Sequence, residues 1–252
     1  MANQRVNGFV RLNRGVSSWV DRTFPSFAAE ADYKSQLRGL IGAFLGPRPR
    51  TRVLEAGGID RPLLARGPEV VYDGLDIEHR EACETIYDDF LVQSIEEPIP
   101  REYDLIISVT LLEHVRDNHA SLRSCFGALT PGGAVMHYLP SRYHPYSLIL
   151  RAIGPRLQKK LIDRLHPEAR AVAGYPAFFH LCSPRQMRRA LQEIGYANIR
   201  VLPSYRAAGY FTFLAPVYVL VLAYENLCRA LGLQELCSGF VVVAEKPMGA
   251  RS

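Results

Sequence analysis

The sequence lacks the features that mark several protein classes. Its cysteines are few among 252 residues, namely Cys83, Cys125, Cys182, Cys228 and Cys237. None lies in a C-x-x-C pair or a Cys/His cluster with zinc spacing, so we expect reduced thiols and no metal. No signal-peptide stretch opens the chain. The longest uncharged apolar run, 209–224, is shorter than the roughly 20 residues of a membrane span. These absences predict a cytoplasmic protein that meets a membrane at most from its surface.

Strong charge of either sign is also absent. The chain has 30 Lys and Arg residues against 25 Asp and Glu residues, a net charge of +5. A mildly basic surface suits an anionic partner, but it does not select nucleic acid, a membrane or an acidic substrate. The composition, 48% hydrophobic and 22% charged, is typical of a globular protein. A chain of this length often forms one α/β domain.

Short apolar runs alternate with helical stretches from residue 52 onward. This alternation predicts a doubly wound α/β fold with a mostly parallel sheet of seven strands. Such sheets bind ligands beyond the carboxyl ends of the strands, where the strand order reverses. The predicted strands are 52–56, 70–76, 85–89, 103–109, 134–139, 199–202 and 239–247.

Helical patterns occupy the remaining segments of the single predicted domain, 1–252. Residues 1–46 form an N-terminal helical segment that includes a helix over 29–45, and 47–140 form the core. Helices are also predicted at 118–129 and at 183–194, where Ser183 is the N-cap and Pro184 the first helical residue. Two cap insertions follow the core, 141–182 and 205–236. The first contains a basic amphipathic helix over 155–165, and the second an apolar helix over 210–231.

Four segments carry recognisable motifs in a fixed order. V-L-E-A-G-G-I-D at 53–60 is a strand, an acidic residue and a glycine-rich turn, and Y-D-G-L-D-I at 72–77 ends a second strand in a carboxylate. Y-D-D-F lies at 87–90. Y-D-L-I-I-S-V-T-L-L-E-H-V-R-D at 103–117 is followed by L-T-P-G-G-A-V at 129–135. In this order they resemble the class I S-adenosylmethionine-dependent methyltransferases, particularly the group that includes quinone-pathway enzymes.

The resemblance implies a site for S-adenosylmethionine on the first motif. Glu55 would hold the amino group of the cofactor, and Gly57 would let the backbone approach it, with Ala56 and Gly58 lining the turn. Ile59 departs from the family pattern because a second glycine is usual there. This departure puts the shape of the loop, and with it cofactor affinity, in question.

Residues of the next motifs complete the expected cofactor site. Asp76 ends the second strand about twenty residues after the first motif, at the spacing where nucleotide-binding folds place a carboxylate for the ribose hydroxyls. The resemblance implies that Asp89 bonds the adenine amino group and that Phe90 packs on the ring, with Asp88 as the alternative. Their neighbours in the expected set are Ile77, Ser108 and Val109.

Methyl transfer from a sulfonium mainly requires alignment and desolvation, and sometimes the removal of a proton. Histidine is the natural base for a hydroxyl acceptor. The candidates are His144 and His180, with Tyr143 as a weaker one, whereas His114 is expected to be a packed or cofactor-adjacent residue. The resemblance implies a small-molecule acceptor, with O-methylation favoured. The apolar insertions predict that this acceptor is large and apolar, such as a quinone precursor, a lipid or a polyketide-like molecule. They also allow a homodimer or peripheral membrane contact.

Other readings remain open at this point. A nicotinamide-dependent oxidoreductase would share the strand, turn and ribose carboxylate, but no G-x-G-x-x-G follows the first strand. A nucleic-acid amino-methyltransferase is disfavoured because the fourth strand ends in S-V-T-L rather than an N-P-P-Y loop. A non-catalytic binding or assembly protein that kept the fold is the remaining alternative, and Ile59 is the residue that supports it.

Overall fold

The computed structural model describes residues 8–28, 33–149, 151 and 175–249. The chain forms two compact units. The helical unit comprises Met1–Asp32, Tyr143–Tyr175 and Pro203–Gly239, and the sheet unit comprises Tyr33–Arg142, Pro176–Leu202 and Phe240–Ser252. The basic helix predicted over 155–165 lies outside the described residues.

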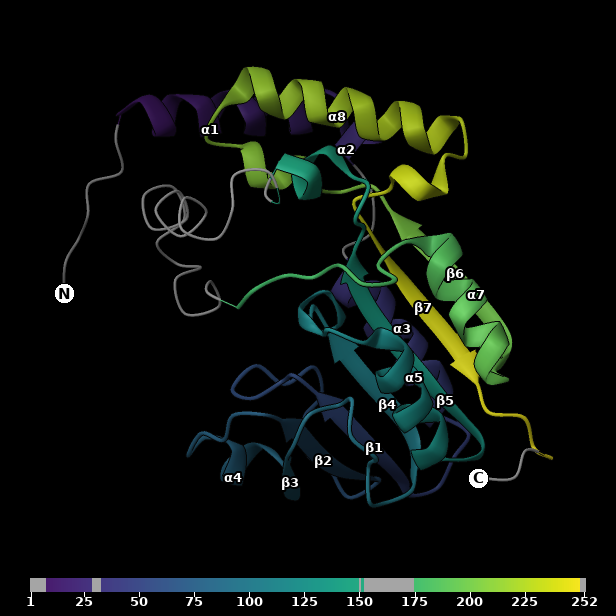
Figure 1. The fold of residues 1–252 in the computed structure, drawn as a ribbon. Coiled ribbons are helices and arrows are strands. Elements are labelled where there is room, and N and C mark those ends of the chain that lie inside the picture. Colours follow the sequence, from purple (N-terminus) through teal and green to yellow (C-terminus); the bar gives the residue numbers. More distant parts are fainter. Residues whose placement is uncertain (1–7, 29–32, 150, 152–174, 250–252) are drawn as a thin grey trace. The chain divides into compact units, whose positions relative to one another are not determined.

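Seven strands form one sheet in the order β3-β2-β1-β4-β5-β7-β6. The pairs β1–β2, β2–β3, β1–β4 and β4–β5 are parallel, and the arrow of β7 runs against that of β4 in Figure 1. The order reverses at β1, so the predicted doubly wound fold is confirmed. The bounds are β1 Thr51–Ala56, β2 Val70–Asp76, β3 Asp89–Val92, β4 Tyr103–Val109, β5 Leu129–Pro140, β6 Ala197–Ser204 and β7 Gly239–Glu245.

The predicted third strand, 85–89, is wrong. A short helix, α4 (Cys83–Ile86), occupies its first part, and β3 begins only at Asp89. Cys83 and Tyr87 are both buried in the core. Their spacing of four residues is that of one face of a helical turn rather than of a strand.

The crossover from β1 to β2 is a chain of turns. Residues 57–69 contain no helix, although parallel strands are usually joined by one. Pro62 lacks a backbone N–H, and the Gly67-Pro68 pair favours a turn. A ligand at the end of β1 therefore meets a loop rather than the N-terminus of a helix.

The sheet is covered by helices whose ends are set by identifiable residues. On one face α3 (Tyr33–Leu45) buries Leu37 and Ile41 in the main hydrophobic core. In α5 (Asn118–Ala128) the N-cap side chain is Asp117, which accepts the N–H groups of the first turn. In α7 (Pro184–Ile194) the Ser183 hydroxyl accepts the N–H of Gln186, so the predicted N-cap is confirmed.

The helical unit joins segments that are distant in sequence. It contains α1 (Gly8–Thr23), α2 (Pro25–Ala28), η3 (Ala208–Phe211), α8 (Ala215–Ala230) and η4 (Gln234–Leu236). Asn13 Oδ1 accepts the N–H of Ala215 at 2.8 Å, and the Ser17 hydroxyl lies 3.3 Å from the Thr212 carbonyl. The predicted apolar helix over 210–231 is therefore a partner of α1. Among the described helices, none is both long and apolar enough to cross a membrane.

Candidate functional site

The ends of three neighbouring strands define the candidate site. Ala56 ends β1 and pairs in register with Leu75 of β2 and Ser108 of β4. Gly57 follows with a φ of 82°, and its N–H donates to the Leu75 carbonyl at 2.8 Å. Because L side chains rarely adopt this φ, the turn requires glycine here. The turn lies where the strand order reverses, which is where doubly wound sheets bind ligands.

Glu55 is buried beneath this turn, and its carboxylate contacts the chain itself. The N–H of Leu63 lies 3.0 and 3.2 Å from the two carboxylate oxygens. The hydroxyl of Tyr72 donates to Oε2, and that of Tyr87 lies 3.5 Å from the same atom. Burial raises the pKa of Glu55, while these hydrogen bonds oppose the rise. Glu55 therefore holds the β1–β2 loop against the two tyrosines.

The next two residues show how closely the chain fills this loop. A Cβ at Gly58 would lie 2.3 Å from the Tyr87 hydroxyl and 2.7 Å from Cδ of Glu55, so only glycine fits. Ile59 has a φ of 43°, a left-handed conformation that is strained for a β-branched residue. The position where the family usually has glycine thus keeps the backbone conformation that glycine favours.

Asp76 lies at the carboxyl end of β2. Its Oδ1 accepts the N–H of Glu78 at 3.0 Å, and burial raises its pKa. The next residue, Ile77, is 64% exposed. A carboxylate beside a glycine turn at the switch point fits the diol of a nucleoside. The residues therefore fit the nucleoside part of S-adenosylmethionine, whereas the Glu55 carboxylate is engaged with the protein.

The third motif lies at the other end of its strand. Asp89 is the first residue of β3 and pairs with Asp73 in register, so it precedes the strand instead of following it. It forms an ion pair with Arg101, while Asp88 accepts the N–H of Tyr72. Phe90 fills the space beside Gly74, where a Cβ would lie 2.5 Å from its ring. The predicted strand over 85–89 ends at Asp89, but β3 begins there, four residues later than predicted. Asp88 and Asp89 therefore lie at the other end of β3 from Val92, which pairs with Asp76.

Two residues that the sequence reasoning missed follow β3 at its carboxyl end. The N–H of Gln93 donates to the Asp76 carbonyl at 3.0 Å. Ser94 comes next, and its hydroxyl accepts the N–H of Glu96 at 3.2 Å. To predict that these residues lie beside Asp76, one would have needed the strand register, which pairs Asp76 with Val92.

At the end of β4, Ser108 and Val109 face different surroundings. Ser108 is fully buried, and its hydroxyl lies 2.8 Å from Nδ1 of His137 on β5. Burial lowers the pKa of His137 to about 4, so the ring is neutral at physiological pH. Val109 packs against the main core. The Ser108 side chain therefore bonds within the sheet unit rather than facing an open site.

Glu113 is a third residue that the sequence reasoning missed. It lies in the short helix η1 (Leu112–His114) beyond β4, where its carbonyl accepts the N–H groups of Phe178 and Phe179. Its side chain is buried, and Oε2 has no hydrogen-bond partner among the residues that the structure describes. Desolvation raises the pKa of Glu113 to about 8. Nε2 of His114 lies 3.8 Å from Oε1. The L-E-H-V motif was the available signal, but only the structure shows that a distant loop buries the carboxyl group.

The predicted base His180 is tied to the start of α5. Its Nδ1 accepts the N–H of Asn118 at 3.0 Å, and its carbonyl accepts a hydrogen bond from the Asn118 side chain at 2.6 Å. When the ring is neutral, its proton therefore lies on Nε2. This contact makes His180 part of the anchor between the 176–182 loop and α5.

The other two candidates, His144 and Tyr143, belong to the helical unit. His144 is buried, its Nδ1 accepts the N–H of Tyr146 at 3.2 Å, and Nε2 lies 3.6 Å from Oε1 of Glu225. Burial lowers the pKa of His144 to about 4. Tyr143 is 39% exposed. The structure thus places these two residues in a different unit from Asp76 and Gly57.

Comparison with known proteins agrees with the motif order. A family model described as a methyltransferase domain matches residues 16–201. The ubiquinone biosynthesis O-methyltransferase of Pseudomonas entomophila (strain L48) is 26% identical over 129 residues, which cover 50% of this chain and 52% of that protein. The chain thus spans about half the length of the curated relatives that it matches.

Solved structures share the fold at low sequence identity. A SAM-dependent methyltransferase from Archaeoglobus fulgidus is 16% identical with a TM-score of 0.52, over 85% of this chain and 93% of the other. Phosphoethanolamine N-methyltransferase 2 of Haemonchus contortus, in complex with S-adenosyl-L-methionine, is 14% identical with a TM-score of 0.50, over 92% and 60%. At these identities the likeness describes the fold alone.

Proposed function

The chain belongs to the class I S-adenosylmethionine-dependent methyltransferases, and from this premise we propose that it methylates an oxygen of a small, apolar acceptor. The observation that carries the proposal is the Gly57 turn beside the Asp76 carboxylate, at the point where the strand order reverses. When bound, S-adenosylmethionine supplies a methyl group that its sulfonium activates for in-line displacement. The protein must then align the acceptor and exclude water.

The residues around the turn have different roles in donor binding. Asp76 accepts the ribose hydroxyls, and the backbone at Gly57 approaches the donor closely. Glu55 acts as a positioning residue, because its oxygens hold Leu63 and Tyr72 and thereby fix the loop. Gln93 and Ser94 follow β3 beside Asp76 and line the adenine end of the site.

An oxygen acceptor is supported by the curated relatives, which are O-methyltransferases of ubiquinone biosynthesis. The fold does not distinguish the acceptor atom, since one structural neighbour is an N-methyltransferase. Apolarity of the acceptor is supported by the apolar composition of the second insertion, 205–236, in the sequence.

Glu113 is the proton acceptor that fits a hydroxyl substrate. A base works best when its pKa lies near the working pH, and desolvation brings the pKa of Glu113 to about 8. Its Oε2 is unpaired within the described part of the chain. His180 is less suitable, because its Nδ1 already accepts a backbone N–H. Loss of the rising limb of the pH–rate profile in Glu113→Gln, with unchanged donor affinity, would support this role.

Calorimetric titration with S-adenosylmethionine and its demethylated product tests the donor site. The wild type should bind both, and Asp76→Ala should bind about a hundredfold more weakly, because two hydrogen bonds to a charged acceptor are lost. Glu78→Ala is the matched control, since it removes an exposed carboxylate two residues away. Equal losses in both variants would remove Asp76 from the site.

A methyltransferase-like protein without turnover is the second candidate. It is favoured by the strained Ile59 and by the side chains that fill the space at Gly58. A wild type that binds neither donor nor product in the same titration would make it the better description of this chain. Ile59→Gly should then restore binding if the loop alone is at fault.

A further inference from the structure

The helix α1 exposes a continuous row of apolar side chains. Phe9, Leu12, Val16 and Trp19 are 57%, 69%, 41% and 55% exposed. Their spacing of three and four residues puts them on one side of the helix, and we call this row the apolar stripe. An adjoining side of α1 is the packed one, with Asn13 and Ser17 buried against the α8 region.

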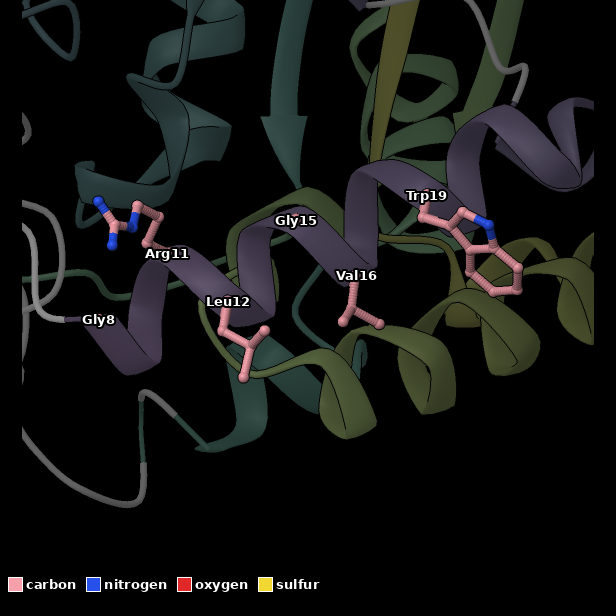
Figure 2. A pocket seen from close by; sticks show the side chains of 6 residues that line it. All are labelled: Gly8, Arg11, Leu12, Gly15, Val16 and Trp19. Atoms are coloured by element: carbon pink, nitrogen blue, oxygen red, sulfur yellow. The ribbon is translucent and has the colours of Figure 1, made fainter.

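A groove of about 520 Å³ runs along the same helix. It is lined by Gly8, Arg11, Leu12, Gly15, Val16 and Trp19. Figure 2 shows Leu12 and Val16 pointing to one side of α1, with Arg11 on the other. Nothing lies within 4 Å of a Cβ built at Gly8 or Gly15, so the two glycines leave the groove open.

Positive charge lies on α1 outside the apolar stripe. Arg11, Arg14 and Arg22 all lie on α1, and in the described part of the chain no carboxylate pairs with them. The only acidic residue of α1, Asp21, already accepts the hydroxyl of Tyr218. A helix with apolar and aromatic residues on one side and arginines on its other sides has the chemistry of an interfacial helix.

The excess positive charge of the chain lies in the same unit as the apolar stripe. The helical unit contains 12 of the 30 Lys and Arg residues and 7 of the 25 Asp and Glu residues. The sheet unit contains the other 18 basic and 18 acidic residues, so its net charge is zero. The net charge of +5 is therefore carried entirely by the unit that exposes the apolar stripe. An anionic lipid surface complements both features.

We propose that the apolar stripe of α1 binds an anionic membrane surface, with Arg11, Arg14 and Arg22 at the level of the headgroups. A second copy of the chain fits less well, because a two-fold contact would bring together two helical units that each carry the excess positive charge. The proposal does not rest on the methyltransferase activity or on the identity of the acceptor.

The single tryptophan makes the test specific, since Trp19 is the only one in the chain. Its fluorescence should shift to the blue with vesicles of phosphatidylcholine and phosphatidylglycerol in a two-to-one ratio. The shift should be weaker with pure phosphatidylcholine. Added salt should reduce the binding, because screening weakens the attraction of arginines to headgroups.

Variants separate the two contributions. Leu12→Asp combined with Val16→Asp should weaken vesicle binding by more than about tenfold, because it removes buried apolar area. Arg11→Gln and Arg14→Gln should each cost about fivefold on anionic vesicles only. Met248→Asp is the matched control, since Met248 is 78% exposed but belongs to the neutral sheet unit.

Two results would overturn the proposal. One is a wild type whose Trp19 emission does not change with anionic vesicles. The other is a blue shift that needs no lipid, rises with protein concentration and accompanies dimers in sedimentation, which would make a second copy the occupant. Circular dichroism of each variant guards against simple unfolding. Donor titration is a separate measurement on the sheet unit, so failure of the proposed function would be recognised on its own.

Discussion

The sheet unit and the helical unit each contain a buried glutamate whose carboxylate holds a loop, but the hydrogen-bond partners of the two carboxylates differ. Glu55 accepts the N–H of Leu63 and the hydroxyl of Tyr72. Glu225 accepts the N–H groups of Ala207 and Ala208 at 2.5 and 3.0 Å, beside the buried ring of His144. Both carboxylates replace the water that unpaired backbone donors would otherwise need.

The difference lies in what each loop supports. The Glu55 loop fixes the turn at the switch point of the sheet, in a unit with balanced charge. The Glu225 contact fixes the chain that leads into η3, in a unit with excess positive charge and exposed apolar helices. The same local device therefore supports the proposed donor site in one unit and the chain before η3 in the other.

Removing each glutamate tests whether the two units are stabilised separately. Glu55→Ala and Glu225→Ala should each lower the free energy of unfolding of their own unit by about 3 kcal/mol, because buried donors lose their acceptor. Urea titration can follow Trp19 fluorescence for the helical unit and donor binding for the sheet unit. If Glu55→Ala moved the Trp19 transition as far as Glu225→Ala does, the units would unfold together and the comparison would fail.

Glu113 sharpens the comparison because no described residue forms a hydrogen bond with its Oε2. Desolvation raises its pKa from 4.5 to about 8, so the folded chain keeps a proton that the unfolded chain has lost between these values. Stability should therefore fall as pH rises through this window. Glu113→Gln cannot titrate, so its stability relative to the wild type should increase by about 2 kcal/mol between pH 5 and pH 7. Thermal unfolding at several pH values measures this, and a constant difference would mean that Glu113 is ionised.

Ile59 gives the smallest expected effect. Ile59→Ala removes packing but keeps the φ of 43°, whereas Ile59→Gly removes the packing and relieves the backbone. The glycine variant should therefore be more stable than the alanine variant by about 1 kcal/mol. Denaturant unfolding of both variants decides this. An alanine variant that is equally or more stable would show that the loop is unstrained.

The sequence predicted most of the sheet because its strands are buried apolar runs. The bounds of β2 and β4 match the predicted 70–76 and 103–109, and Ser183 and Pro184 marked the start of α7. The third strand was misplaced because Cys83 and Tyr87 pack as a helical turn. Local pattern cannot separate these alternatives when the apolar run is so short.

The site was less predictable, because its geometry depends on contacts between distant residues. The position of Asp76 followed from spacing alone. The carboxylate of Glu55 is engaged by the hydroxyls of Tyr72 and Tyr87. The burial of Glu113 depends on a loop at Phe178, which is more than sixty residues away in the sequence. No single motif contains this information.

The bond between Asn13 and Ala215 joins residues 202 positions apart, and this has a consequence for the order of folding. During synthesis α1 leaves the ribosome first, yet its partner α8 follows only after strands β1–β6 have been made. The strand pairs from β1 to β5 close much shorter loops and can form earlier. The helical unit is therefore expected to be the last part of the chain to fold. Until α8 is made, α1 has no partner, and both its packed side and its apolar stripe are accessible to chaperones.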